Sequence, residues 1–413
     1  MSKELKIVPE LRFLEFEADG EWEIDDLGNH CFITTGRLDA NAMVEDGKYR
    51  FYTCAKDYYF IDDFAFDTNA LLISGNGAHV GYIHHYHGKF NAYQRTYVLD
   101  DFDKDIHYIQ YFLERNLKSR IASEKKDGNT PYIVKSTLGE MKILSPKREL
   151  EQQKIASCLS SLDELIATHN DKLEALKDHK KGLMQNLFPQ EGETVPKYRF
   201  KEFEGDGEWE IRSIEESIDL ISGIALKSEE LSDDKSGTPI LRGINITEGQ
   251  IRHSEEMDKF YLGDISEIEK YLVEENDIVI GMDGSKVGKN VSLIAEKDTD
   301  SILIQRVARI KAVNSEVNYL YQHFVSDGFR RYVDIVNTSS GIPHISAKQI
   351  RDFEIGFPPK ILEQQKTAYC LSAVDELITA QAEKIEQLQI HKKGLMQGLF
   401  PNPSANSGET IES

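Results

Sequence analysis

Two stretches of this 413-residue chain combine the side chains that recognise phosphate groups and nucleobase edges. Seven basic and three acidic residues lie between Arg115 and Lys142, and the same numbers lie between Arg306 and Arg351. Arginine, lysine, glutamine and histidine donate hydrogen bonds to phosphate oxygens and to base edges, and arginine and glutamine can do so through two bonds at once. Each basic residue alone is more often a solvated surface charge, so the duplication of the pattern is what indicates nucleic-acid binding.

The first stretch contains Arg115, Lys118, Arg120, Lys125, Lys126, Lys135 and Lys142, with Tyr132 among them. The second contains Arg306, Arg309, Lys311, Arg330, Arg331, Lys348 and Arg351, interleaved with Tyr319, Tyr321, Phe329 and Tyr332. Both stretches occupy equivalent places, because three short islands recur in the two halves: residues 71–81 and 278–288, 94–95 and 305–306, and 131–133 and 343–345. The Gly77 and Gly284 loops would let the backbone approach a groove closely. We predict DNA contacts from His79, Gln94, Arg95, Lys118, Arg120, Tyr132, Lys135, Arg242, Lys286, Gln305, Arg306, His344 and Lys348.

Residues 281–290 look at first like a phosphate-binding P-loop, but two positions do not fit. Asp283 stands where the leading glycine belongs and would repel a phosphate, and Asn290 stands where Ser or Thr would hold magnesium. The corresponding stretch of the first half, which ends at Tyr82, lacks the lysine. We therefore predict that both stretches are loops between strands.

Metal and catalytic motifs are equally incomplete. His79, His84, His85 and His87 form the densest histidine cluster, but it contains no Cys or acidic residue and has no equivalent in the second half. We expect a polar hairpin near the binding face, and no metal site. The string Phe357-Pro358-Pro359-Lys360 lacks the polar first residue and the terminal aromatic of a methyltransferase loop. With no Ser-His-Asp arrangement to be placed either, the sequence favours a binder over a catalyst.

Two long heptad patterns are available to position these segments. Apolar residues recur every three or four positions from Ile155 to Leu187 and again towards Leu399, which predicts two helices of a coiled coil. Pro189 and Pro401 follow them as stops. The first helix, about residues 149–187, would be roughly 58 Å long. The predicted seam consists of Leu159, Leu162, Ile166, Leu173, Leu176, Leu183, Leu371, Val374, Ile378, Ile385, Leu388 and Leu395.

Each apolar stripe needs a partner, and pairing within one chain avoids the entropy cost of recruiting a second. The pattern alone does not decide the orientation. A parallel pair would set Lys180 against Lys392, whereas an antiparallel pair would lay each lysine stem along apolar positions. We favour the antiparallel pair, as a rigid spacer between two globular modules, with a helix lying on its own domain as the alternative.

These helices belong to an internal repeat that runs through the chain. The six residues from Lys180 recur from Lys392, 212 positions later, and the block from Arg12 to Ile24 recurs 187 positions later. The repeat predicts seven parts: a leading segment (1–23), a first variable region (24–145), a central helix (146–190), a repeat of the leading segment (191–210), a second variable region (211–357), a distal helix (358–401) and a flexible tail (402–413). Duplicated scaffolds with diverged modules suit the reading of two different targets, although drift after duplication gives the same pattern.

Composition sets the outer limits. Hydrophobic residues make up 40% and charged residues 29%, which excludes wholesale disorder. No apolar run is long enough for a membrane span, and the first six residues lack an apolar signal core, so we expect a cytoplasmic protein. The four cysteines form no C-x-x-C pair, which excludes a Cys-rich zinc site or disulfide framework.

A formal charge of −22 argues against DNA on its own. It keeps open a second hypothesis, in which the chain is a non-catalytic coiled-coil adaptor between proteins or an acidic mimic of DNA.

Taken together, these blocks resemble the specificity subunit of type I restriction-modification systems over nearly the whole chain. The strings that begin at Leu150 and Lys180, and the leading residues Pro9–Phe13 with Gly20-Glu21-Trp22, are similar to that family's conserved regions. The resemblance implies an α+β fold in which two α/β target-recognition domains, each with a curved sheet, are separated by two long conserved helices. Those helices would form an intramolecular antiparallel coiled coil with a pseudo-twofold internal repeat.

The resemblance also implies a function. Each recognition domain would read one half of a bipartite, asymmetric site on double-stranded DNA, with half-sites roughly one helical turn, about 34 Å, apart. The chain would have no catalytic activity, and its helices would dock two methyltransferase subunits, to which motor-nuclease subunits can be added. S-adenosylmethionine, ATP and magnesium would belong to those partners. Because the chain is acidic, we expect some phosphate contacts to come from the partner subunits.

Overall fold

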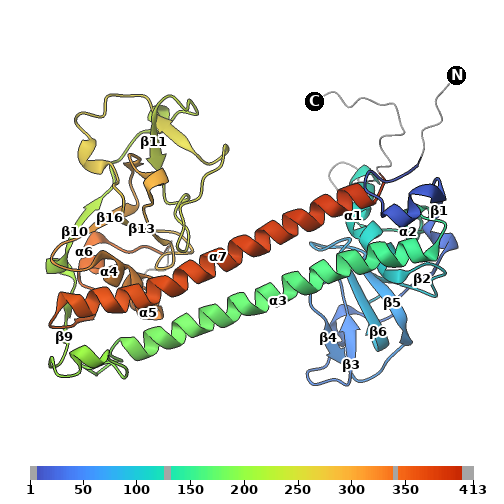
Figure 1. Cartoon of the computed structure of the whole chain (residues 1–413), viewed down its shortest axis with the longest axis horizontal. Helices are drawn as coiled ribbons and strands as arrows, with labels where there is room; N and C mark the ends of the chain where they lie inside the picture. The colour runs from blue at the N-terminus through green and yellow to red at the C-terminus, as the bar shows by residue number, and fades with distance from the viewer. Residues whose placement is uncertain (1–6, 125–131, 338–342, 402–413) are drawn as a thin grey trace. The chain divides into compact units, whose positions relative to one another are not determined.

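The computed structural model describes residues 7–124, 132–337 and 343–401 (Figure 1). The tail predicted at residues 402–413 lies outside these residues. The chain divides into unit 1, Met1–Asp171 with Ala382–Ser413, and unit 2, Lys172–Gln381. Two helices of 39 residues each, α3 (Glu149–Leu187) and α7 (Ile361–Leu399), contribute residues to both units. Each unit combines helices with a sheet, as the predicted α+β class requires.

Unit 1 is built on a six-stranded sheet of order β2-β7-β5-β6-β3-β4. Its central strand β5 alternates between two apolar faces, because Leu71 and Ile73 pack towards helix α1 (Ile106–Glu124) whereas Leu72 packs on the opposite face. The strands are β1 (Glu23–Asp26), β2 (Phe32–Thr35), β3 (Tyr49–Tyr52), β4 (Tyr59–Ile61), β5 (Phe66–Ser74), β6 (Ile83–Ala92), β7 (Thr96–Asp100) and β8 (Lys142–Ser145), with a short helix α2 (Lys135–Gly139) before β8.

Unit 2 contains a four-stranded sheet of order β10-β16-β13-β14 and a three-stranded sheet of order β12-β11-β15. Helix α5 begins where Ser326 Oγ accepts a hydrogen bond from Phe329 N at 3.1 Å, which caps its first turn. The strands are β9 (Glu210–Ser213), β10 (Ile218–Ser222), β11 (Thr238–Leu241), β12 (Lys259–Tyr261), β13 (Ile278–Gly281), β14 (Val291–Leu293), β15 (Ile302–Leu303), β16 (Val307–Ala312) and β17 (Glu354–Phe357). The helices are α4 (Val317–Phe324), α5 (Asp327–Val336) and α6 (Ala347–Arg351).

A two-stranded ladder joins the beginning and the end of each variable region. In unit 1, β1 pairs with β8, and in unit 2, β9 pairs with β17. A buried tyrosine of the domain's helix holds each ladder, since Tyr108 donates to Leu144 O at 2.5 Å and Tyr319 donates to Gly356 O. The internal repeat therefore extends from the amino-acid sequence to the hydrogen bonds of the two units.

The two long helices are antiparallel within each unit (Figure 1). In unit 1, Lys392 Nζ donates to Asp163 at 2.7 Å, while Leu159 and Leu399 share one core. In unit 2, the ammonium of Lys180 lies 2.7 Å from Asp375, and Leu183 packs in the core that contains Leu371. Ascending positions on α3 meet descending positions on α7 in both cases.

We predicted that the side chains of Lys180 and Lys392 would lie along apolar positions of the other long helix, and this prediction is wrong. Each lysine ends at an aspartate of the other helix, Asp375 or Asp163, and those aspartates are themselves equivalent positions of the repeat. Ion pairs between α3 and α7 therefore favour the antiparallel arrangement. The ammonium groups of the two lysines bind carboxylates and do not extend over an apolar surface into water.

Of the seam residues, Leu159, Leu371, Val374, Ile385 and Leu388 are buried. Leu162, Ile166, Leu173, Leu176, Leu183, Ile378 and Leu395 are partly exposed. Among the helices of the described residues, none has the length and apolar character that crossing a membrane requires.

Candidate nucleic-acid interface

Three segments that are distant in sequence meet beside the end of β5 in unit 1. Gly75 N donates to Arg95 O at 2.8 Å, and Gly75 O accepts from Ile133 N at the same distance. Gln94 N also donates to Leu38 O at 2.9 Å, which fixes the turn from the other side. We name the group of residues 75–81, 93–96 and 132–135 loop cluster 1.

Unit 2 repeats this hydrogen-bond frame. Met282 N donates to Arg306 O at 2.9 Å, Met282 O accepts from Ile345 N at 2.8 Å, and Gln305 N donates to Ile224 O at 2.8 Å. We name residues 282–288, 304–307 and 343–348 loop cluster 2. The repeat islands therefore form one structural site in each unit, on a backbone frame that is the same in both.

The two glycine loops join antiparallel strands, so their prediction as strand-to-strand loops is confirmed. Gly81 and Gly288 both have a φ of 79°. A Cβ would lie 2.7 Å from Ile121 Cδ1 at the first and 3.0 Å from Val333 Cβ at the second, so each loop is clamped against a helix. Gly77 and Gly284, at the loop tips, also have positive φ but face open space. The tips are therefore both well positioned and accessible.

Loop cluster 1 brings together five of the residues predicted to contact DNA, all of them exposed: His79, Gln94, Arg95, Tyr132 and Lys135. Tyr97 OH donates to Ile133 O at 3.0 Å beneath them, and burial raises the pKa of this tyrosine. Lys118 and Arg120 lie outside the cluster, on α1. Arg120 is occupied there by Glu124 at 2.7 Å, whereas Lys118 is exposed.

Loop cluster 2 likewise brings together five predicted residues, all exposed: Lys286, Gln305, Arg306, His344 and Lys348. Lys348 forms a 2.6 Å ion pair with Asp352 one helical turn away, which raises its pKa. Arg242 is not in the cluster. It follows β11 in the three-stranded sheet, where its backbone is held in a turn by Asn245.

Sequence reasoning missed two carboxylates that belong to these sites. Gln94 Nε2 donates to Asp39 at 2.8 Å in unit 1, and Arg306 donates to Asp283 at 2.9 Å in unit 2. Asp283 occupies the position that Asn76 holds in the first half, 207 residues earlier. That alignment was the available signal, since a change from amide to carboxylate within a shared loop marks a different ligand preference.

The two basic stretches are less cationic at the surface than their composition indicates. Arg309 is buried and donates to Lys270 O and Leu272 O, at 3.1 and 2.8 Å, beside Asp277. Arg115 and Arg351 also donate to backbone carbonyl groups, and Lys142, Lys311 and Arg330 pair with carboxylates. Lys125, Lys126 and Pro131 lie outside the described residues. Several of the cations in the two basic stretches therefore stabilise the fold and are not free to bind a nucleic acid.

The interleaved aromatic residues of the second stretch are also structural. Tyr319 and Phe329 are fully buried, and Tyr321 and Tyr332 pack against the same core. Burial raises the pKa of Tyr321, so its hydroxyl stays protonated. Tyr132 of the first stretch differs from them, because it is 59% exposed.

The histidine cluster forms part of strand β6 and its neighbouring loop. His84 Nε2 lies 3.1 Å from Ala55 O, and His85 Nε2 lies 2.7 Å from Asn69 Oδ1. Burial lowers the pKa of both, so both are mainly neutral at pH 7. In the described ranges, no three His, Cys, Asp or Glu side chains converge as metal ligands.

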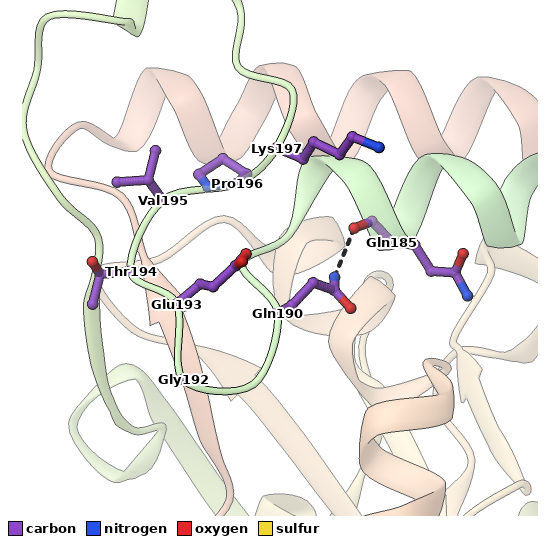
Figure 2. Close-up of a pocket in the computed structure, with 8 residues that line it drawn as sticks. All are labelled: Gln185, Gln190, Gly192, Glu193, Thr194, Val195, Pro196 and Lys197. Atoms are coloured by element: carbon purple, nitrogen blue, oxygen red, sulfur yellow. Dashed lines mark hydrogen bonds between the residues drawn. The ribbon is translucent and has the colours of Figure 1, made fainter.

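Two surface hollows of the described residues lie outside the loop clusters. One is formed by residues 190–197 after α3, where Gln190 Nε2 donates to Gln185 O at 2.6 Å (Figure 2). Figure 2 shows Lys197 extended away from Glu193, with no nucleophile and base brought together. A second hollow lies beside α3, between Phe13 and Ser161. Neither hollow contains a residue of the two loop clusters.

Comparison with known proteins places these features in one family. Residues 20–178 and 206–389 both match the type I restriction modification DNA specificity domain. The chain is 27% identical over 402 residues to the MjaVIII type I restriction enzyme specificity subunit of Methanocaldococcus jannaschii, which covers 92% of each chain. It is 35% identical over 181 residues to the EcoDI specificity subunit of Escherichia coli, a match that spans 43% of this chain and only 40% of that relative.

A solved structure shares the fold. The S subunit of a type I restriction-modification system from M. genitalium superimposes with a TM-score of 0.63 at 17% identity, over 96% of this chain and 100% of that one.

Proposed function

Because the chain belongs to the family of type I restriction-modification DNA specificity proteins, we propose that loop clusters 1 and 2 read the two halves of a bipartite, asymmetric DNA site. DNA specificity is the role of that family, and the alternative of a protein adaptor or acidic DNA mimic is not favoured. The observation that carries the proposal is the repeated frame, in which Gly75–Arg95 and Met282–Arg306 are joined by equivalent hydrogen bonds. The same frame presents different side chains in the two units, which is what reading two different half-sites requires.

Exposed lysines at the clusters provide for the phosphate backbone. Lys135 belongs to loop cluster 1, and Lys286 lies in the glycine loop of cluster 2. Contacts of this kind position a duplex but carry no sequence information. The net charge of −22 is unfavourable for binding a polyanion. Partner subunits that close around the duplex would supply the remaining positive charge, so the isolated chain would bind DNA weakly.

The chain would contribute recognition and no catalytic step. Residues that could have marked a catalytic site fill other roles, since His84 and His85 are held within the sheet and Asp283 is paired with Arg306. S-adenosylmethionine, ATP and magnesium would serve the partner subunits.

The repeated strings of the long helices indicate where two copies of one partner would dock. In the repeated segment 150–154, Glu151 binds Arg12, Gln152 accepts from Asp105 N, and Lys154 pairs with Glu15. Three residues of this segment therefore bind other residues of unit 1. Their equivalents in unit 2 are bonded in the same way. The leucine of this segment is instead exposed to solvent: Leu150 is 60% exposed and its equivalent Leu362 is 61% exposed.

A second pair of leucines behaves alike. Leu165 is 41% exposed and Leu377, its equivalent, is 56% exposed, although the neighbouring Asp163 and Asp375 are engaged across the helices. A single exposed leucine is common on protein surfaces, so the support for docking comes from the exposure of the same positions in both units. Because the surface occurs twice, we assign it to two methyltransferase subunits.

The test uses the chain assembled with its methyltransferase subunits and a library of randomised duplexes. The proposal expects two short enriched motifs separated by a fixed gap, and an affinity that falls steeply as salt rises. Recovery of no motif, together with an affinity that is insensitive to salt, would exclude DNA reading and return the protein-adaptor hypothesis.

A further inference from the structure

The turns at residues 93–96 and 304–307 present the same two residue types, glutamine followed by arginine, on the same backbone frame. In each turn a carboxylate of the same unit binds one of these two side chains. The bound side chain is the glutamine in unit 1 and the arginine in unit 2. This difference involves side chains only, so it is independent of the backbone hydrogen bonds that define the clusters.

In unit 1 the glutamine is held. Gln94 Nε2 donates to Asp39 Oδ1 at 2.8 Å, which occupies one of the two N–H donors of its amide. Arg95 is exposed, and its guanidinium has no hydrogen-bond partner among residues 7–124, 132–337 and 343–401. Its backbone carbonyl is fixed by Gly75 N, so the side chain starts from a defined point.

In unit 2 the arginine is held. Arg306 Nη1 donates to Asp283 Oδ2 at 2.9 Å, and the residue has a φ of 68°, a conformation that is uncommon outside glycine. Gln305 is exposed, and its amide makes no hydrogen bond to another described residue. The side chain that no carboxylate restrains is therefore an arginine in loop cluster 1 and a glutamine in loop cluster 2.

These two groups have different base preferences in the major groove. A guanidinium donates two hydrogen bonds to O6 and N7 of guanine, whereas a glutamine amide matches the donor and acceptor at N6 and N7 of adenine. A side chain that is bound to a carboxylate must break that hydrogen bond before the same group can contact a base. The free energy of binding a base is therefore more favourable for the residue of the turn that no carboxylate binds.

Resting on the proposed function, we propose that Arg95 reads a guanine in the half-site of unit 1 and that Gln305 reads an adenine in the half-site of unit 2. Gln94 and Arg306 then act as secondary groups, restrained by Asp39 and Asp283. The two halves of the target differ in the base read at this equivalent position.

Exchange of the two unheld residues tests this assignment. The assembled complex with methyltransferase subunits is selected against a randomised duplex library, as wild type and as Arg95→Gln and Gln305→Arg. Arg95→Gln is expected to change one position of one half-site from guanine towards adenine, with a loss of about 5- to 150-fold on the original base. Gln305→Arg is expected to make the opposite change in the other half-site only.

Matched controls lie outside the clusters. Arg252→Gln and Gln250→Arg make the same chemical changes at exposed positions of unit 2 and are expected to leave both motifs as in wild type. A wild-type selection without any motif would count against the proposed function. Wild-type motifs that both exchanges leave unchanged, or weaken equally at all positions, would overturn the base assignment alone.

Release of the held arginine gives a second test that does not alter either reading residue. Asp283→Ala removes the acceptor of Arg306 and is expected to add guanine preference to the half-site of unit 2. An unchanged motif in this variant would show that the carboxylate does not decide which residue of the turn reads the base, and would overturn that part of the argument.

Discussion

The guanidinium of Arg12 donates two parallel hydrogen bonds, each 2.8 Å long, to the carboxylate of Glu151. The glutamate side chain is 1% exposed, and Trp22 Nε1 donates to the same carboxylate at 3.3 Å. Arg199 and Glu363 repeat the pair in unit 2, with bonds of 2.7 and 2.8 Å. Each leading segment is therefore clamped onto the start of a long helix by a fully engaged carboxylate.

Removal of the arginine should destabilise unit 1 strongly. Arg12→Ala leaves the buried charge of Glu151 without its partner, which costs about 3–5 kcal/mol in comparable buried pairs. Denaturant unfolding of wild type and variant measures the difference. Lys154→Ala is the matched control, because it breaks the half-exposed pair with Glu15 on the same surface and should lower the free energy of unfolding far less than Arg12→Ala. Equal losses for the two variants would contradict the clamp.

The ion pairs across the helices should be energetically coupled. Lys392 lies 2.7 Å from Asp163, and its side chain is 17% exposed, so screening by water is incomplete. A double-mutant cycle with Lys392→Met and Asp163→Asn should give a coupling of about 1 kcal/mol. The pair Lys177 and Glu174, exposed on α3, should give about 0.3 kcal/mol in the same measurement. A coupling near zero for Lys392 would mean that the pair does not help to set the helix register.

The heptad pattern predicted the helices well because it is a local signal. The expected range 149–187 agrees with Glu149–Leu187. The ion partner of each lysine was not predictable in this way, because Lys180 and Asp375 are 195 residues apart and only the folded chain brings them together. Periodicity identified the apolar stripe, whereas the choice of charged neighbours depends on tertiary contacts.

The candidate site shows the same division. The repeat spacing identified Gln94-Arg95 and Gln305-Arg306 as corresponding turns, but it did not reveal that Asp39 holds one residue and Asp283 the other. It also could not distinguish a binding cation from a structural one. Arg309 and Arg95 have the same side chain, yet the guanidinium of Arg309 donates to backbone carbonyls inside unit 2.

His323 should make unit 2 less stable at low pH. Burial against Phe188 and Tyr319 lowers its pKa to about 3, whereas an unfolded histidine has a pKa of about 6.5. Between these values the unfolded chain binds a proton that the folded chain does not. The free energy of unfolding therefore falls as pH falls through this window, by up to about 1.4 kcal/mol per pH unit.

The matched variant is His323→Phe, because unit 1 has Phe112 at the equivalent position. Unfolding measured at pH 7, 6 and 5 should show the gap between variant and wild type widening in favour of the variant as pH falls. Parallel stability curves for the two proteins would indicate that His323 accepts a proton in the folded state.

Lys286 should act as a phosphate contact, and its effect should differ in kind from that of Arg95. It is exposed in the glycine loop of cluster 2, and its ammonium forms no ion pair with another described residue. A lysine on a phosphate releases counterions on binding, so Lys286→Gln should reduce the slope of log affinity against log salt by about 0.9. Affinity should fall by a similar factor for all duplexes, because a phosphate is the same whatever the base.

Lys197→Gln, outside both clusters, should leave the slope unchanged. Loss of preference at one position of the half-site, with an unaltered slope, would instead assign Lys286 to a base edge, and would mean that the glycine loop enters the groove and does not track the backbone.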